Sequence, residues 1–350
     1  MILPMLNIDE IQPHWIAGFA TLFELCKIAP DEQVIILSET ASSPLHVHLA
    51  KLGLGQVGRH YTHLELPSIP DPTGPIVRSS GATQILGTQP LAVRMMCEAD
   101  IIIDTSIEGL MHASQTGEIL KSGTRIMNIP AEHPDVLCRL LPTPEMKDIV
   151  KEAVSHCREA HQMLVNSEDG TELTVDMGGA ASVGIWGWTD RAGTLAHWPG
   201  GIVVSFPQKN TVNGRLVMAP GDMNLSFKRY IESEVILNIS DDYITSIEGN
   251  GADARLMRDY LAGFDSKEAY ATSHVGWGLN RAARYEALSI YDNAQTNGTE
   301  LRAVAGNFLY STGANEFAGR FTRGHFDLPM MGCDIRLDDR LVVSHGKLVS

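Results

Sequence analysis

The first half of the chain alternates between two hydrophobic patterns. Apolar side chains at helical spacing predict helices over residues 14–28, 44–52, 90–99 and 116–123. Short, nearly all-apolar runs rich in β-branched residues predict strands over residues 33–38, 100–105 and 124–130. Strands that are apolar on both faces need cover on both sides, which helices flanking a parallel sheet supply. The pattern therefore predicts an α/β fold whose N-terminal domain is doubly wound and Rossmann-like.

The second half has a different hydrophobic pattern. A long helix predicted over residues 142–164 closes the first domain, and beyond it the chain shows alternating strand patterns separated by turn residues. The Asp-Asp steps at 241–242 and 338–339 predict hairpin turns, and one further helix is predicted over 252–264. This succession of strands and hairpins with one helix is typical of an α+β domain. The predicted domains are residues 1–165 and 166–350.

Residues 53–58 (GLGQVG) satisfy the G-x-G-x-x-G motif of dinucleotide-binding proteins. That motif holds a pyrophosphate when a strand precedes it and a helix follows, because the phosphates then meet a helix N-terminus. Here the order is reversed, since a helical pattern precedes the glycines and RHYTHLELP follows them. We interpret the motif as the glycine-rich end of a helix.

Composition and charge exclude several classes of function. The chain has 27 Lys and Arg against 42 Asp and Glu, a net charge of −15, which repels phosphate backbones and anionic lipid. No apolar run approaches the roughly 18 to 20 residues that cross a bilayer, and MILPMLNIDEIQPHW lacks the basic start of a secretory signal. The 5 cysteines are scattered, with no C-x-x-C pair, which is typical of reduced thiols. We expect a cytoplasmic protein that binds neither nucleic acid nor membranes.

The segment RGHFDLPMMGCDI carries the clearest candidate chemistry. His325 and Asp327 are two residues apart, and on a strand that spacing aims both side chains at one point. The pair offers two ligands for a divalent metal, or alternatively forms a buried salt link at a strand end. His274, in the turn-like run SHVGWGLN, would be a third ligand. Two imidazoles and one carboxylate form the facial set that binds non-haem iron(II) and leaves positions open, whereas zinc prefers a closed tetrahedral site.

Two further histidines stand in places where ligands bind. His112 comes just beyond the carboxyl end of the predicted strand DIIIDT, where open α/β sheets place ligand contacts. His197 lies in LAHWPGG, beside Trp198. Each is either an ordinary loop histidine or a group that moves a proton or orients a substrate. Trp198 would wall a pocket or pack in the core.

Several segments, taken in order, carry a resemblance to a known family. They are DTSIEGLMHA, LKSGTRIM, HWPGG, GDMNLSFKRY, SHVGWGLN, GNFLYSTG and GHFDLP through CDIRLDD. The chain resembles the 2,5-dihydroxypyridine 5,6-dioxygenases of bacterial nicotinate and hydroxypyridine breakdown, which are themselves similar to the M29 (aminopeptidase T-like) metallopeptidases. The resemblance covers most of the chain.

The resemblance implies roles for particular residues. It puts His274, His325 and Asp327 at the three iron positions of the dioxygenases, and His112 and His197 in the substrate pocket. It also implies that the Ser311 hydroxyl donates a hydrogen bond to the substrate. The peptidases resemble this chain less here, because a glutamate of their two-metal site stands where this chain has His274.

One departure from the family bears on the substrate. Members of the family have a glutamate in the run before the HWP loop, where this chain has Ile185. If that carboxylate helps to transfer a proton or binds a ring hydroxyl, the substrate here would be a differently substituted pyridine.

These observations lead to one main hypothesis and two rivals. The main hypothesis is an Fe(2+)-dependent dioxygenase that opens the ring of a dihydroxylated N-heterocycle, most simply 2,5-dihydroxypyridine, with O₂ as the second substrate and N-formylmaleamate as the product. The family relation also implies a homo-oligomer. The rivals are an M29-like metal-dependent aminopeptidase or amidohydrolase, and a metal-free binding protein. In the main hypothesis the second domain is the α+β catalytic, metal-binding domain.

Overall fold

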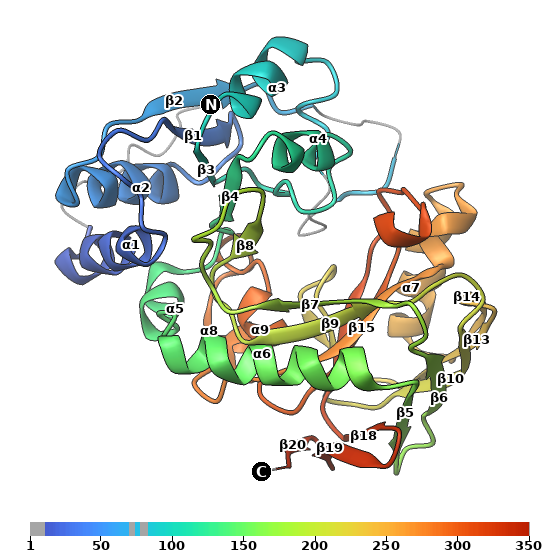
Figure 1. Cartoon of the computed structure of the whole chain (residues 1–350). Helices are drawn as coiled ribbons and strands as arrows, with labels where there is room; N and C mark the ends of the chain where they lie inside the picture. Colours follow the sequence, from blue (N-terminus) through green and yellow to red (C-terminus); the bar gives the residue numbers. More distant parts are fainter. Residues whose placement is uncertain (1–10, 70–73, 78–82, 350) are drawn as a thin grey trace.

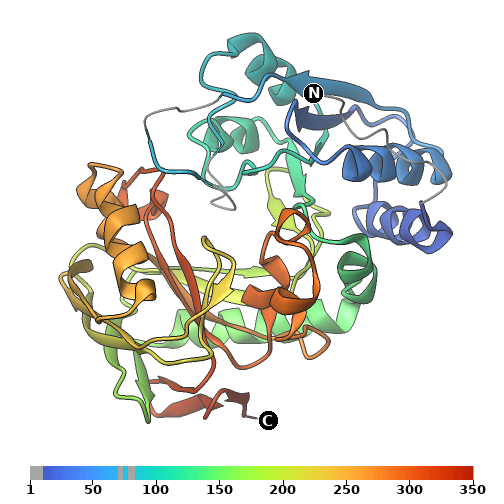
Figure 2. The same cartoon turned by 180° about the vertical axis from the view of Figure 1, so that it is seen from behind.

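The computed structural model describes residues 11–69, 74–77 and 83–349, and it has two layered parts (Figures 1 and 2). The first part is a five-stranded sheet of order β2-β1-β3-β4-β8, in which every pair of neighbours is parallel. Its strands are β1 (Val34–Glu39), β2 (Thr62–Leu66), β3 (Ile101–Asp104), β4 (Arg125–Asn128) and β8 (Leu195–His197). The predicted doubly wound α/β fold of this part is confirmed.

Helices cover both faces of this sheet because its strands are apolar on both faces. Ile36, Ile101 and Met127 pack in one core with the first two helices, while Ile35 and Ile102 pack on the other face with the next two. The four helices are α1 (Pro13–Leu25), α2 (Pro44–Gln56), α3 (Pro90–Cys97) and α4 (Thr116–Lys121). The sheet is therefore buried on both sides, as parallel sheets require.

The second part is built from two antiparallel sheets and the long helix α6 (Pro144–Glu159), which follows the short helix α5 (Pro134–Arg139). The larger sheet has the order β14-β13-β10-β6-β5-β18-β19-β20. Its strands are β5 (Gln162–Ser167), β6 (Glu172–Asp176), β10 (Val212–Met218), β13 (Val235–Ser240), β14 (Tyr243–Glu248), β18 (Cys333–Leu337), β19 (Arg340–Ser344) and β20 (Lys347–Leu348).

The smaller antiparallel sheet, of order β17-β16-β15-β9-β7, carries the candidate site. Its strands are β7 (Ala181–Ile185), β9 (Ile202–Phe206), β15 (Thr272–Gly278), β16 (Phe308–Thr312) and β17 (Asp327–Met330). The remaining elements are β11 (Met223–Asn224), β12 (Arg229–Tyr230), α7 (Ala252–Ala262), α8 (Ala287–Ile290), α9 (Thr299–Ala303) and the 3-10 turns η2 (Lys267–Tyr270), η3 (Asn293–Gln295) and η4 (Glu316–Ala318).

Alternation along the strands gives the smaller sheet two different faces. Val275, Tyr310 and Leu328 point into the large core shared with the eight-stranded sheet. Because successive side chains of a strand point to opposite faces, their neighbours in sequence point the other way. Among those neighbours are Ser311 and Asp327, so the second face of this sheet carries the polar residues.

Three local predictions need correction. The helix predicted over 142–164 ends at Glu159, since the Asp338 carboxylate accepts hydrogen bonds from the His161 and Gln162 amides and β5 begins there. The run SHVGWG is strand β15 and no turn, because Gly276 allows the close approach of β9: a Cβ there would lie 1.9 Å from the Val203 carbonyl oxygen.

In the glycine motif, α2 continues through Gly53 and Gly55 and ends at Gln56, so the helix stops later than the first glycine predicts. Gly53 is where α2 packs on α1, since a Cβ there would lie 2.8 Å from the Phe19 Cβ. Gly58, with a φ of +68°, takes the left-handed conformation after the helix.

Both Asp-Asp hairpins are confirmed: Asp241 and Asp338 have positive φ between antiparallel strands. The predicted division at residue 165 remains a proposal, and the first sheet takes its fifth strand, β8, from beyond it. Among the described residues, no helix has the length and apolar character needed to cross a membrane.

Candidate active site

Three neighbouring strands bring the predicted ligands together. In the register of the smaller sheet, His274 on β15 pairs with Ser311 on β16, and Ser311 pairs with Asp327 on β17. Partners in register share a face, so these side chains point away from the large core. His325 lies two residues before the start of β17 and is 6% exposed.

The group formed by His274, His325 and Asp327 has the geometry of a ligand set. Each residue offers one ligand atom, and these atoms all lie within 4.8 Å of one another. His325 Nε2 is 3.1 Å from Asp327 Oδ2, and His274 Nε2 is 3.9 Å from Asp327 Oδ1. The Ser311 hydroxyl donates to Asp327 Oδ1, and Arg302 Nε donates to Oδ2 at 2.6 Å. These two donors hold the carboxylate in place.

The protonation states of His274 and Asp327 suit a metal. Burial lowers the pKa of His274 to about 3, although the nearby Asp327 carboxylate opposes this shift. Burial alone would raise the pKa of Asp327, but the charge of Arg302 and the interactions with His325 hold it well below its usual range. A neutral imidazole with a free lone pair and an ionised carboxylate are the forms that bind metals. The buried Nδ1 atoms of His274 and His325 have no hydrogen-bond partner, which also fits a polar site built for an additional group.

A pocket of about 500 Å³ lies in front of this group, between the smaller antiparallel sheet and the parallel sheet. One wall is apolar and comes mainly from β7 and β9. The apolar lining includes Val183, Ile185, Ile202, Val204, Phe206 and Leu309. A pocket of this size holds a small molecule, and its apolar wall suits a flat ring. Ile185, the residue at which the sequence predicts a departure from the family, is among the residues that line the pocket.

Both histidines with a predicted role in proton transfer line the pocket. His112 Nδ1 is 3.0 Å from Glu316 Oε1, and its ring centroid is 5.6 Å from that of His325. His197 Nδ1 donates to the Pro199 carbonyl at 2.8 Å, so the neutral ring keeps its lone pair on Nε2. Burial, with a smaller contribution from the charge of Arg302, lowers the pKa of His197 to about 4.

The two predicted substrate contacts, Trp198 and Ser311, lie in different surroundings. Trp198 is fully buried in the core of the first part, where its ring packs on Phe19 and its Nε1 donates to the Leu140 carbonyl, so it does not line the pocket. Apolar residues of the parallel sheet surround the Trp198 ring, which explains why it is buried there. Ser311 gives its hydroxyl proton to Asp327 and so supports a candidate ligand, while its hydrogen bond to the substrate stays a prediction.

Sequence reasoning missed three polar residues of the pocket: Arg302, Glu316 and Asn128. Arg302 and Glu316 act through partners far away in the sequence, Asp327 and His112. The signal for Asn128 was available, because it lies near the carboxyl end of the predicted strand 124–130, at the edge where α/β sheets bind ligands.

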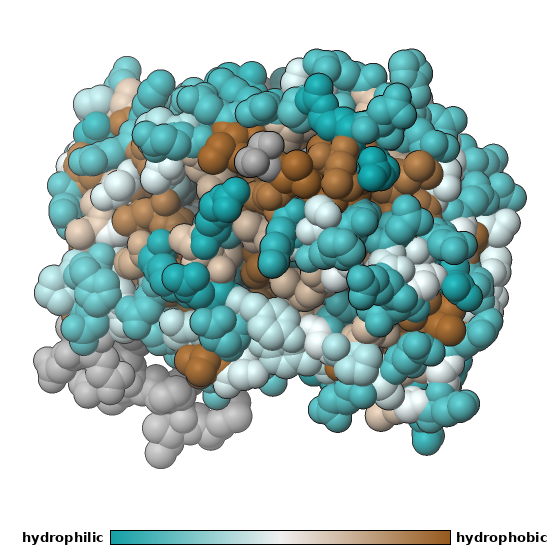
Figure 3. All heavy atoms as spheres, turned by 90° about the horizontal axis from the view of Figure 1, so that it is seen from below, coloured by the Kyte–Doolittle hydropathy of each residue, from teal (hydrophilic) through white to brown (hydrophobic). Residues whose placement is uncertain are grey.

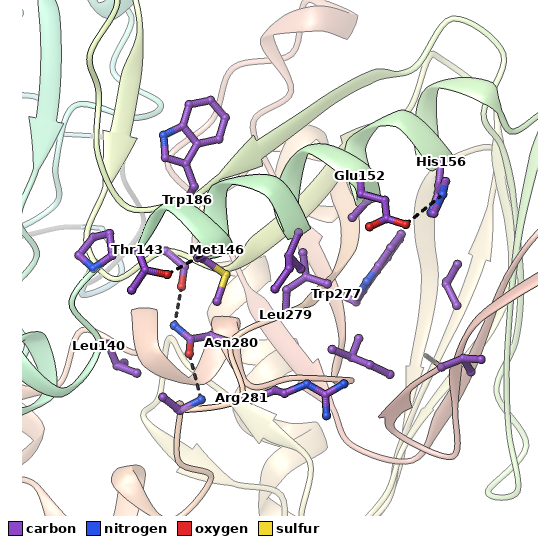
Figure 4. A pocket seen from close by; sticks show the side chains of 18 of the residues that line it. Leu140, Thr143, Met146, Glu152, His156, Trp186, Trp277, Leu279, Asn280 and Arg281 are labelled. Atoms are coloured by element: carbon purple, nitrogen blue, oxygen red, sulfur yellow. Dashed lines mark hydrogen bonds and ion pairs between the residues drawn. The ribbon is translucent and has the colours of Figure 1, made fainter. Parts of the chain in front are cut away.

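A second cavity, of about 750 Å³, lies beside α6 (Figure 4). Trp186, Trp277 and Leu279 contribute to its lining, and apolar side chains also gather in a hollow when the molecule is seen from below (Figure 3). Its Glu152–His156 ion pair is 4.0 Å long, and the Glu152 side chain is 74% exposed. A pair so open to solvent offers little to catalysis, so the candidate active site is the smaller pocket.

The fold and the pocket define the class of the protein: an α/β enzyme with a buried candidate metal centre of two histidines and one aspartate. The chain belongs to the 2,5-dihydroxypyridine 5,6-dioxygenase family, whose model matches residues 14–350. A relative from Pseudomonas putida, 2,5-dihydroxypyridine 5,6-dioxygenase, is 34% identical over 337 residues, which are 95% of each chain.

Two solved structures share the fold. The structure of the 2,5-dihydroxypyridine dioxygenase from Pseudomonas putida KT2440 has a TM-score of 0.90 and 33% identity, covering 96% of this chain and 97% of that one. Wild-type AmpT from Thermus thermophilus has a TM-score of 0.57 at 11% identity, covering 96% of this chain and 100% of that one. The second likeness shows the fold alone.

Proposed function

We propose that this enzyme uses O₂ to open the ring of 2,5-dihydroxypyridine. The C5–C6 bond breaks and both oxygen atoms enter the product, N-formylmaleamate. The observation that supports this function most strongly is the buried group of His274, His325 and Asp327, which faces a pocket sized for one small ring. A group with one carboxylate and two imidazoles also favours a single metal over the two-metal site of a peptidase.

In this proposal His274, His325 and Asp327 hold iron(II). When bound, iron(II) supplies the redox chemistry that lets O₂ react with a closed-shell ring. The protein supplies the rest: the Ser311 and Arg302 donors fix the carboxylate, and the apolar wall keeps water from the ring.

The two pocket histidines have different roles. His112 Nδ1 is hydrogen-bonded to the Glu316 carboxylate, which can only accept, so the other ring nitrogen, Nε2, has the lone pair that can take a proton from a ring hydroxyl. His197 remains neutral because it is buried, and its Nε2 lone pair accepts a hydrogen bond that orients the ring. Assembly into a homo-oligomer, which the family relation implies, and residence in the cytoplasm, which the scattered cysteines favour, belong to the same proposal.

Oxygen uptake tests this function. Protein loaded with iron(II) without oxygen should, on mixing with O₂ and 2,5-dihydroxypyridine, consume one O₂ per ring as the ultraviolet absorbance of the ring disappears. His325→Ala should abolish both signals, whereas His345→Ala, a change at an exposed histidine, should leave them intact. A protein that hydrolyses a peptide or amide without consuming O₂ would refute the proposal in favour of an M29-like hydrolase.

A further inference from the structure

The carboxyl edge of the parallel sheet presents a row of three polar residues. Asp104 on β3 is in register with Asn128 on β4, and Asn128 is in register with His197 on β8. Their side chains therefore share one face at the end of the sheet where α/β proteins bind ligands. Asn128 and His197 both line the pocket, opposite the candidate metal ligands of the other sheet. The proposed mechanism has no use yet for Asn128.

Asp104 fixes the orientation of the Asn128 amide. Asp104 is fully buried, and its Oδ1 accepts from the Ser106 amide at 3.0 Å and from the Ser106 hydroxyl at 2.6 Å. Its Oδ2 accepts from the Leu110 amide at 2.9 Å and from Asn128 Nδ2 at 2.8 Å. Burial raises the pKa of Asp104, and these donated bonds oppose that rise. A carboxylate can only accept, so the amide must turn its NH₂ group toward Asp104.

The loop after β3 closes tightly over this pair. Gly109 has a φ of +73°, and a Cβ there would lie 2.4 Å from Asn128 Nδ2. The amide is thus held between the carboxylate and the loop, with its nitrogen inward. The oxygen, Oδ1, is the atom that Asn128 offers to the pocket, and it can only accept hydrogen bonds.

We propose that Asn128 Oδ1 accepts a hydrogen bond from the ring N–H of the substrate and thereby selects a pyridone over a carbocyclic diol. This inference rests on the proposed function and adds its specificity determinant. 2,5-Dihydroxypyridine in its 2-pyridone form has one ring N–H, next to a carbonyl group. A buried acceptor that loses its partner costs free energy, so the pocket rejects a ring with C–H at that position. Asp104 is the positioning residue of the pair.

Binding in the absence of O₂ tests the inference separately from turnover. Calorimetric titration of the iron(II)-loaded protein compares 2,5-dihydroxypyridine with hydroquinone, in which C–H replaces the ring nitrogen. The wild type should prefer the pyridine by about 10-fold or more. Asn128→Leu should remove most of that preference by weakening pyridine binding, with little effect on hydroquinone. Asn238→Leu, on β13 of the eight-stranded sheet, is the matched control and should keep the wild-type ratio.

A second variant covers the case in which Asn128→Leu does not fold. Asp104→Asn keeps one acceptor oxygen and puts an NH₂ group in place of the other, so it no longer fixes the Asn128 amide and should lower the pyridine preference. Because Ser106 or Leu110 donors then lose their acceptor, this variant should melt below the wild type, and binding is measured at a temperature at which it is folded. Equal affinity of the wild type for the two ligands would overturn the inference, even if the enzyme turns over the pyridine. An unchanged ratio in both folded variants would overturn it too. If the wild type binds 2,5-dihydroxypyridine much more tightly than hydroquinone but consumes no O₂, the inference is supported and the dioxygenase reaction is refuted.

Discussion

Glu132 offers a direct test of how the two parts of the molecule are joined. It follows β4, is 2% exposed, and its Oε1 accepts a hydrogen bond from the Thr299 amide at the start of α9, at 2.5 Å. Its carbonyl oxygen accepts from His46 Nε2 at 2.7 Å. Burial, reinforced by the charge of Glu300, raises the pKa of Glu132 from 4.5 to about 7, although the Thr299 amide opposes the shift.

The sign of the pH effect follows from this raised pKa. Between pH 4.5 and pH 7 the folded protein binds a proton at Glu132 that the unfolded chain has released, so the free energy of unfolding falls as the pH rises through this window. A difference of about 2.5 pKa units at about 1.36 kcal/mol each sets an upper limit near 3 kcal/mol. Between pH 5 and pH 8 the loss from this residue is about 2–3 kcal/mol.

Glu132→Gln removes the titration and keeps a side-chain oxygen for the Thr299 amide. Urea denaturation at pH 5 and pH 8, at equal metal loading, measures the unfolding free energy of variant and wild type. The variant should gain about 2–3 kcal/mol of unfolding free energy relative to the wild type between the two pH values. Glu24→Gln, on an exposed position of α1, controls for the changed net charge. If the unfolding free energies of Glu132→Gln and the wild type differ by the same amount at pH 5 and pH 8, the reasoning is refuted.

Two further changes test the ligand support and the packing beside the pocket. Ser311→Ala removes a hydroxyl donor to Asp327 and should weaken metal binding about 10-fold, measured by competition with a chelator; unchanged affinity would show that Ser311 gives Asp327 no support. Gly184→Ala puts a Cβ 2.3 Å from Val150 Cγ1 between β7 and α6 and should lower the unfolding free energy by about 1–3 kcal/mol. A melting temperature equal to the wild type would mean that α6 shifts freely.

The sequence is most informative where a local pattern decides the structure. The alternation that puts Ile35 and Ile36 on opposite faces of β1 is enough to predict a sheet covered on both sides. The spacing of His325 and Asp327 is enough to predict that their side chains meet. Both conclusions follow from a period of two residues and need no information about distant segments.

Sequence reasoning is weaker where distant segments compete for the same backbone. The overlong helix at 142–164 is an example, because Asp338, far along the chain, binds the amides just beyond its true end. Ser311 is another, because nothing in its local sequence shows that β16 places it in register with Asp327. Pairing between strands decides both cases, and no local periodicity encodes it.

The two sheets contribute different residues to the pocket, so the chemistry of the pocket depends on how the sheets are held together. The antiparallel sheet brings the candidate ligands, including Asp327, and the parallel sheet brings Asn128 and His197. The five-residue helix α9 contacts both sheets. The Thr299 amide donates to Glu132, which follows β4 of the parallel sheet, and Arg302 donates to Asp327 of the antiparallel sheet. A protonated, neutral Glu132 still accepts a hydrogen bond from the Thr299 amide, so the link between Glu132 and α9 survives a change of protonation. Loss of this link would move Arg302 and the candidate ligand Asp327 together. The stability of α9 therefore bears directly on the geometry in which a ring and a metal would meet.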